Sequence, residues 1–241
     1  MKSTKLQSFL LFPILLLFTS SCSFFQNCET GKGEILEVEV KIEHFSSLEV
    51  SSRVKVFLEQ SPQQKVTIKA QENLIRLLDT ELNGETWDIR FNRCVTSENP
   101  IEIYIKTSEL NEIGINGSGS VIGKSMLSTD LLDLSINGSG DIDLLLAVKE
   151  LNSEISGSGT IRLDGNTKSH KIEIDGSGDV KAFDLRSDAT EIEINGSGDA
   201  KINASYSLDV EINGSGDVYY KGNVKQISSD INGSGNLHQE Q

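Results

Sequence analysis

The chain has 241 residues, of which 36 are acidic and 22 are basic, and its formal net charge is −14. So acidic a chain is repelled by phosphate backbones, which excludes nucleic acid as a partner and disfavours binding to anionic lipid headgroups. With 21 glycines and only 6% aromatic residues, the composition indicates a narrow solenoid rather than a bulky globule.

The N-terminus has the pattern of an export signal. Lys2 and Lys5 precede an apolar run, and small residues then lead to Cys22, which predicts a signal peptide over residues 1–21. The position of Cys22 resembles that in a bacterial lipoprotein signal, where the cysteine is acylated. We therefore expect an exported protein whose only membrane contact is this lipid, anchored to the cell envelope at the outer membrane. Thr19 stands where such signals usually have Leu, so ordinary cleavage nearby is the alternative.

Two further cysteines follow the acylation site. Residues 22–33 form a short polar tether, which contains Cys28, and Cys94 lies much further along the chain. In an oxidising envelope compartment the two thiols can form a disulfide that ties the tether to the fold. Two unpaired thiols, or a buried Cys94, are the alternatives.

Residues 34–108 read as a β-rich portion. Apolar and polar residues alternate over 34–42, 48–58 and 66–68, and again over 87–91 and 101–105, as they do in half-buried strands. Residues 71–80 break the alternation and have the spacing of a short helix or capping turn. Asn83-Gly84 predicts a hairpin turn, and residues 97–100 predict a polar loop.

Residues 109–241 contain a repeat built on Gly-Ser-Gly, with successive copies about nineteen residues apart. The first glycines of the seven copies are Gly117, Gly138, Gly157, Gly176, Gly196, Gly214 and Gly233. A steady period of this length is typical of a solenoid in which each repeat forms one coil. The glycines are interpreted as corners, where the backbone adopts angles unfavourable for other residues and no Cβ fits.

Aligned on this corner, the repeats form columns. Two residues before the first glycine every copy has isoleucine, which predicts an inward ladder of Ile115, Ile136, Ile155, Ile174, Ile194, Ile212 and Ile231. The residue between this isoleucine and the first glycine is mostly asparagine. Asparagine tolerates left-handed backbone angles, and its side-chain amide can form hydrogen bonds with the neighbouring coils. Residues 34–108 are expected to extend the same stack, so that 34–241 is one continuous domain.

The Ile-Asn-Gly corners at 136–138, 194–196, 212–214 and 231–233 resemble those of the auto-transporter adhesin, head GIN domain family of bacterial envelope proteins. Segments 45–58 and 71–74 are similar to that family too. The resemblance implies a right-handed parallel β-helix in a secreted or lipid-anchored protein, and an adhesive role. It carries no catalytic motif that maps onto this chain.

One column on the far side of the corner has a candidate metal site. Asp179, Asp199 and Asp217 follow the corner on consecutive coils, about 4.8 Å apart. Calcium bridging these carboxylates, helped by corner carbonyls, is one interpretation. Exposed carboxylates that need no ligand are the other, and no other cofactor is expected.

No catalytic constellation stands out. His44, His170 and His238 are widely scattered and are interpreted as surface residues, outside any metal or nucleophile arrangement. The Gly-Ser-Gly corners precede strands rather than helices, which argues against phosphate-binding loops.

The favoured function is therefore a rigid, non-catalytic module that binds a surface glycan or protein. A polysaccharide lyase or hydrolase is the alternative, although near-constant coil length leaves no wall for a groove. Binding of a lipid or small apolar ligand ranks third, because a solid isoleucine core leaves no cavity. The coil at 232–237 precedes only a polar tail, so we expect an exposed edge that permits self-association.

Overall fold

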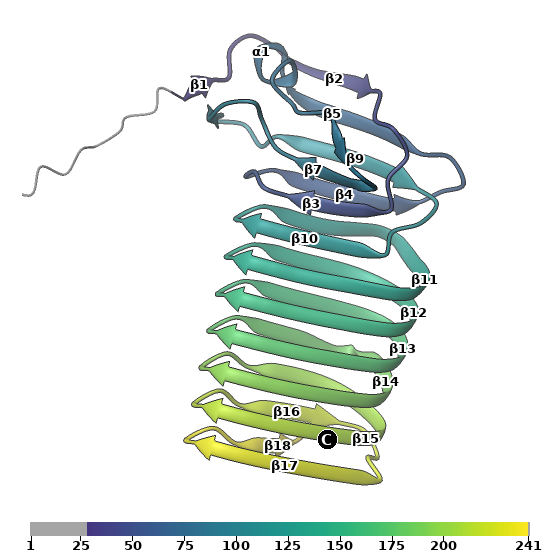
Figure 1. The fold of residues 1–241 in the computed structure, drawn as a ribbon, viewed down its shortest axis with the longest axis vertical. Helices are drawn as coiled ribbons and strands as arrows, with labels where there is room; N and C mark the ends of the chain where they lie inside the picture. Colours follow the sequence, from purple (N-terminus) through teal and green to yellow (C-terminus); the bar gives the residue numbers. More distant parts are fainter. Residues whose placement is uncertain (1–27, 241) are drawn as a thin grey trace, which may run out of the picture.

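The computed structural model describes residues 28–240 and is almost entirely β-structure (Figure 1). The predicted architecture is confirmed: a right-handed parallel β-helix of about seven turns spans residues 112–239, and the N-terminal portion is rich in strands. The signal peptide and Cys22 lie outside the described residues.

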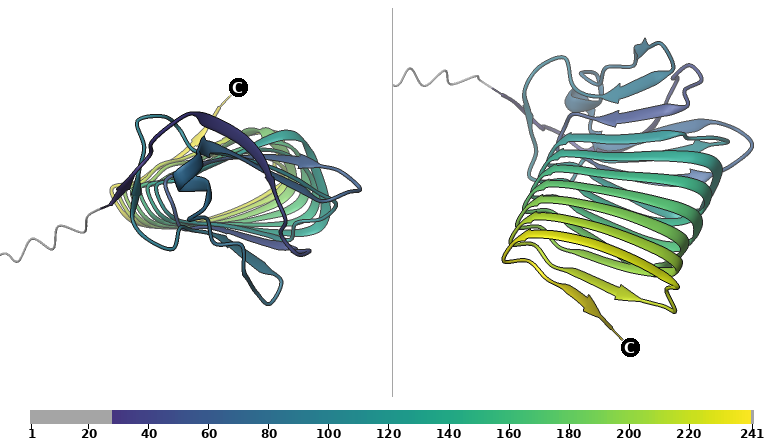
Figure 2. Two further views of the ribbon diagram at one scale, coloured as in Figure 1. Left: turned by 90° about the horizontal axis from the view of Figure 1, so that it is seen from above. Right: turned by 60° about the horizontal axis from the view of Figure 1, so that its bottom comes forward.

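Each coil runs from one Gly-Ser-Gly corner to the next and bends midway, so that the stack has two facing sheets (Figure 2). Every pairing between these coils is parallel, and the corner glycines stay in register. The strands are β10 (Glu112–Gly117), β11 (Ser120–Gly138), β12 (Asp141–Gly157), β13 (Thr160–Gly176), β14 (Asp179–Gly196), β15 (Ala200–Gly214), β16 (Val218–Lys221), β17 (Gln226–Gly233) and β18 (Leu237–Gln239).

The isoleucine column forms the core of the stack. From Ile115 to Ile212 its members are at most 1% exposed, as the alternation predicts. Ile231 in the last coil is 36% exposed, because among the described residues no further coil covers it. Burial of these β-branched side chains on one another supplies much of the free energy that orders each coil.

The corner geometry explains the glycines. The first glycine of each copy has a positive φ, from 126° at Gly117 to 152° at Gly214. In a stacked coil such as that of Gly176, an added Cβ would lie 2.5 Å from the carbonyl oxygen of Gly157. The serine N–H donates to the same carbonyl, as Ser177 does to Gly157 at 2.8 Å.

The asparagine column has only one of its two predicted roles. No non-glycine residue within 28–240 has a positive φ, so the asparagines do not use left-handed angles. The amide ladder is present in the last coils, where Asn213 Nδ2 donates to Asn195 Oδ1 at 3.2 Å and Asn232 Nδ2 donates to Asn213 Oδ1 at 3.4 Å.

The N-terminal portion extends the stack as predicted, but out of sequence order. Strands β3 (Ser47–Val50) and β4 (Lys55–Gln60) form a coil that pairs with β10 and β11. Strands β7 (Thr86–Ile89) and β9 (Glu102–Thr107) then pair with β3 and β4 on the far side. The earlier coil is therefore inserted between the later coil and the repeats.

Antiparallel strands and a helix cover this end of the stack (Figure 1). β5 (Lys65–Gln71) pairs with β9 and with β2 (Ile35–Val40), and α1 (Glu72–Ile75) follows β5 within the predicted helical segment. β6 (Leu82–Asn83) and β7 form the expected hairpin. β2 departs from expectation, because Ile35 and Val38 are 44% and 37% exposed on an edge strand instead of being buried.

One predicted surface histidine lies in the core. His170 is 2% exposed, and its Nε2 lies 2.9 Å from Ser153 Oγ. Its column contains Leu151 and Thr190 in the adjoining coils. Burial lowers the pKa of His170 to about 3, so the ring is neutral at physiological pH. His44 and His238 are exposed, as predicted.

Candidate functional site

The corner edge of the solenoid changes where the repeats end. In β10 and β11 the corner joins Ile115 to Ser120, and these residues align with Val50 and Lys55 in the coil above. In the next coil the aligned residues are Ile89 and Glu102, so the segment 90–101 replaces the short Gly-Ser-Gly turn. This longer segment forms a wall that the regular coils do not have.

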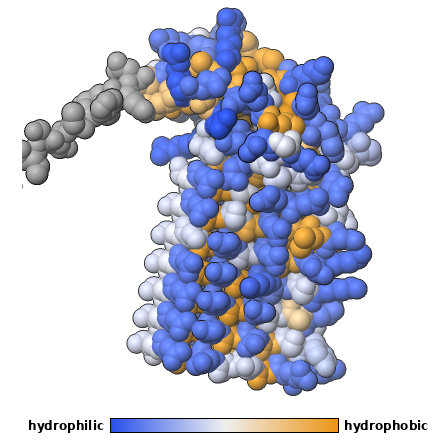
Figure 3. All heavy atoms as spheres, in the orientation of Figure 1, coloured by the Kyte–Doolittle hydropathy of each residue, from blue (hydrophilic) through white to orange (hydrophobic). Residues whose placement is uncertain are grey.

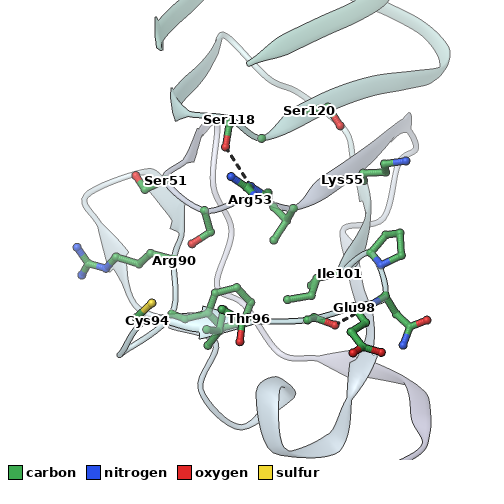
Figure 4. A pocket seen from close by; sticks show the side chains of 18 of the residues that line it. Ser51, Arg53, Lys55, Arg90, Cys94, Thr96, Glu98, Ile101, Ser118 and Ser120 are labelled. Carbon is green, nitrogen blue, oxygen red and sulfur yellow. Dashed lines mark hydrogen bonds between the residues drawn. The ribbon is translucent and has the colours of Figure 1, made fainter. Parts of the chain in front are cut away.

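A cleft of about 920 Å³ lies against this wall. It is lined by the turn 51–54, the segment 90–101 and the uppermost repeat corner at 118–120 (Figure 4). Four basic residues contribute to its lining, against two acidic residues, Glu98 and Asp141; the basic residues are Arg53, Lys55, Arg90 and Arg93. Such a concentration of positive charge contrasts with the acidity of the whole chain. On the face of the repeats seen in Figure 3, hydrophilic and hydrophobic residues form stripes that run lengthwise along the rod.

Three of these cations form no ion pair within residues 28–240, although Lys55 is paired in register with Glu102 of β9. Among the residues that the structure describes, no ion pair involves Arg53, Lys55 or Arg93, and all three are exposed. Arg53 reaches toward the repeat corner, where its Nε donates to Ser118 Oγ at 3.4 Å, and Lys55 lies at the opposite rim (Figure 4). Unpaired guanidinium groups beside a cleft are suited to bind carboxylate, sulfate or phosphate oxygens.

Arg90 differs from these three. Its side chain turns away from the cleft (Figure 4), and it forms ion pairs with Asp79 at 2.9 Å and Asp88 at 3.5 Å. The pKa of Asp79 is lowered, first by the backbone N–H of Glu81 and then by Arg90. Arg90 therefore holds the wall in place rather than offering a free charge.

Neutral hydrogen-bonding groups complete the lining. Hydroxyl groups come from Ser51, Ser52, Thr96, Ser97, Ser118 and Ser120, and the apolar residues at the cleft are Val54, Phe91, Val95, Pro100 and Ile101. Hydroxyls beside basic side chains match the hydroxyl and anionic oxygens of an acidic sugar.

The wall is fixed to the N-terminal tether. Cys28 and Cys94 are joined as a disulfide, with their Cα atoms 4.6 Å apart. β1 (Glu29–Thr30) pairs in parallel with β8 (Val95–Thr96), and Ser97 Oγ donates to Gln71 Oε1 at 3.0 Å. The tether and β5, which ends at Gln71, thus both hold the segment 90–101 in place.

The aspartate column lies elsewhere along the corner edge and has its own hydrogen bonds. Asp199 Oδ1 accepts the N–H of Asp217 at 2.9 Å, and Asp217 Oδ1 accepts the N–H of Asn236 at 2.8 Å. Asp179 lies 3.1 Å from Lys181 Nζ. No group of three or more acidic, histidine or cysteine residues within 28–240 could hold a metal ion. Calcium binding by Asp179, Asp199 and Asp217 stays a prediction, and their hydrogen bonds account for much of the column without a ligand.

The cleft was not predicted from the sequence, and the expectation that no wall exists holds only for the repeats. Part of its signal is present in the sequence, because residues 97–100 predict a polar loop and three arginines lie at 53, 90 and 93 in a strongly acidic chain. What the sequence does not show is that the turn 51–54 and the segment 90–101 meet at the same corner edge.

Comparisons with known proteins agree with this architecture. The profile of the family described as "Putative auto-transporter adhesin, head GIN domain" matches residues 44–224. No curated protein matches the chain by sequence. No helix within 28–240 is long and apolar enough to cross a membrane.

Solved structures of bacterial proteins share the fold. A putative adhesin from Bacteroides fragilis NCTC 9343 is 25% identical with a TM-score of 0.83, and a putative lipid binding protein from Parabacteroides distasonis ATCC 8503 is 26% identical with a TM-score of 0.68. A putative adhesin from Parabacteroides merdae ATCC 43184 shares the fold at 22% identity and a TM-score of 0.71. Each comparison covers 88% of this chain, and 99%, 99% and 98% of the respective neighbour.

Proposed function

Because this chain belongs to the auto-transporter adhesin, head GIN domain family, we propose that it is a non-catalytic surface protein that binds anionic glycans in its cationic cleft. We propose further that the lipid on Cys22 anchors it to the outer membrane. The cleft then lies at the anchored end of the protein, next to the disulfide of Cys28 and Cys94, and the repeats extend beyond it as a rigid rod.

The observation that carries the proposal is the set of three unpaired cations at one cleft of an acidic protein. Arg53 and Arg93 offer planar guanidinium groups, which bind a carboxylate or sulfate through paired hydrogen bonds. Lys55 adds a further positive charge at the rim. The negative charge elsewhere on the chain repels polyanions in general, so binding is confined to this one place.

A glycan array probed with the exported protein tests the proposal directly. Acidic glycans that carry uronic acid or sulfate should bind, their neutral counterparts should not, and binding should weaken as salt increases. Arg53→Gln and Arg93→Gln should each weaken binding by about tenfold or more, since a hydrogen bond to a charged group contributes about 1.5–3 kcal/mol.

The matched control is Arg186→Gln. Arg186 is exposed on the side of the rod, and no ion pair among the described residues involves it. This variant should bind as the natural protein does. If acidic and neutral glycans bind equally, or if Arg53→Gln and Arg93→Gln bind normally, the cleft is not the glycan site.

Two other outcomes correspond to the alternative functions. Appearance of new reducing or unsaturated sugar ends during incubation would support a polysaccharide-active enzyme. Binding to phosphatidylglycerol vesicles in preference to every glycan would support lipid recognition, which is the binding that the Parabacteroides distasonis neighbour is described as having. Phosphate oxygens can occupy the same cations, so the arginine variants should reduce vesicle binding as well.

A further inference from the structure

The two ends of the stack differ in how they are covered. β2, β5 and α1 cover the N-terminal end, whereas β17 at the C-terminal end pairs only with β15 among the described residues (Figures 1 and 2). Ile227 and Ile231 on β17 continue the inward columns of Leu208 and Ile212. They are 48% and 36% exposed, against at most 1% for the residues that they follow.

β17 lacks the features that protect exposed sheet edges. Such edges usually carry several charges, a proline or a bulge. β17 has no proline and no register shift against β15, and Asp230 is its only charged residue. The segment of β15 that it pairs with has Asp209 and Glu211 at the corresponding outward positions, so charge decreases where the edge is open.

We propose that this end docks a second copy of the same chain, with β17 of each copy paired antiparallel across a two-fold axis. The opposite end is capped, so stacking of a capped end on an open end is blocked and the assembly closes as a dimer. The two rods would then lie end to end, with the covering strands β2 and β5 of each copy at the outer ends.

One register satisfies both the apolar and the charged side chains. With Ser229 on the two-fold axis, Ile227 lies opposite Ile231 of the second copy, and both face the interior. Asp230 then lies opposite Ser228 of the second copy, so the two aspartates do not face each other. Gln226 and Asn232 form the remaining outward pair. The unpaired backbone groups of β17 and its two exposed isoleucines are covered by the same contact.

Sedimentation of the exported protein carrying Cys22→Ser tests the proposal without association through acyl chains. The protein with the natural β17 sequence should sediment with twice the monomer mass. The variant with both Ile227→Lys and Ile231→Lys should sediment with the monomer mass and have an unchanged circular dichroism spectrum. Both side chains are already exposed in the monomer, so these changes spare the fold. The matched control is Met126→Lys with Leu145→Lys, at side-chain positions 45% and 39% exposed on the flank of the rod, which should stay dimeric.

An engineered cysteine tests the register. Paired antiparallel strands bring opposite Cα atoms to about 4.5–5.5 Å, within disulfide range. Ser229→Cys should therefore give a disulfide-linked dimer on mild oxidation, and Ser158→Cys on the corner ridge should not. A monomer mass for the protein with the natural β17 sequence would overturn the proposal. So would a dimer that survives both lysines and in which the Ser229→Cys variant stays unlinked. Neither result depends on glycan binding, so the two proposals fail separately.

Discussion

The repeated coils and the two N-terminal coils share one register but differ at their corners. In the repeats a Gly-Ser-Gly turn closes each coil so tightly that the next corner lies directly on its carbonyl oxygen. In the N-terminal coils the turn 51–54 and the segment 90–101 replace it, and the cleft forms between them. Regular stacking thus provides the rigid support, and the interruption of the repeat provides room for a ligand.

The largest expected effect separates a stacked corner from the first one. Gly176 and Gly117 have nearly the same φ, 127° and 126°, but an alanine Cβ at 176 would meet the Gly157 carbonyl, whereas nothing lies within 4 Å at 117. Gly117→Ala should cost about 1–3 kcal/mol through backbone strain alone. Gly176→Ala should cost more than about 4 kcal/mol, because the coils must also separate. Urea unfolding measures both, and equal losses would mean that stacking does not limit the corner.

A second prediction concerns the tether, which only the N-terminal region has. Replacing Cys28 and Cys94 together by serine should lower the free energy of unfolding by about 2–4 kcal/mol, since the disulfide closes a long loop in the unfolded chain. Thiol titration of the unfolded natural protein should find neither Cys28 nor Cys94 free. The repeats contain no cysteine, so hydrogen exchange in their core should change little below the global unfolding limit. Two free thiols would contradict the pairing.

The third prediction concerns the polar pair inside the repeats. The folded pKa of His170 is about 3, below its ordinary value of 6.5, so the unfolded chain binds a proton that the folded chain does not. The contribution of His170 to the free energy of unfolding is therefore highest above pH 6.5, where His170 is neutral in both the folded and the unfolded chain. It decreases as the pH falls from 6.5 toward 3, because the unfolded chain then gains a proton on His170 that the folded chain does not bind. The expected loss is about 2 kcal/mol at about pH 5, measured by urea unfolding across that pH range.

The control for this prediction restores the apolar columns. His170→Leu with Ser153→Ile follows Leu151 and Ile172 in the adjoining coils and leaves no buried polar atom unpaired. It should remove this part of the pH dependence, while Ser153→Ala alone should cost about 1–3 kcal/mol by leaving the ring without its partner. An unchanged pH profile in the double variant would assign the acid sensitivity to other groups.

Much of the repeat region follows from sequence columns near the corner. The alignment on Gly-Ser-Gly was sufficient to predict the inward isoleucines, the parallel stacking and the corner glycines. The burial of His170 differs from the prediction because its column lies further from the corner than the isoleucine column. The residue six positions before the first glycine is Leu132, Leu151 and Leu208 in other coils, which would have indicated an inward position for His170 as well.

By itself the sequence determined the solenoid, because a fixed period places like residues on like residues in neighbouring coils and each position is set by its immediate neighbours. Only the tertiary structure decided the rest. The order of the N-terminal coils, with β3 and β4 inserted between the repeats and β7 and β9, depends on pairing between segments that share no period. The cleft depends on it too, because Arg53 and the segment 90–101 meet only when those two coils stack in that order.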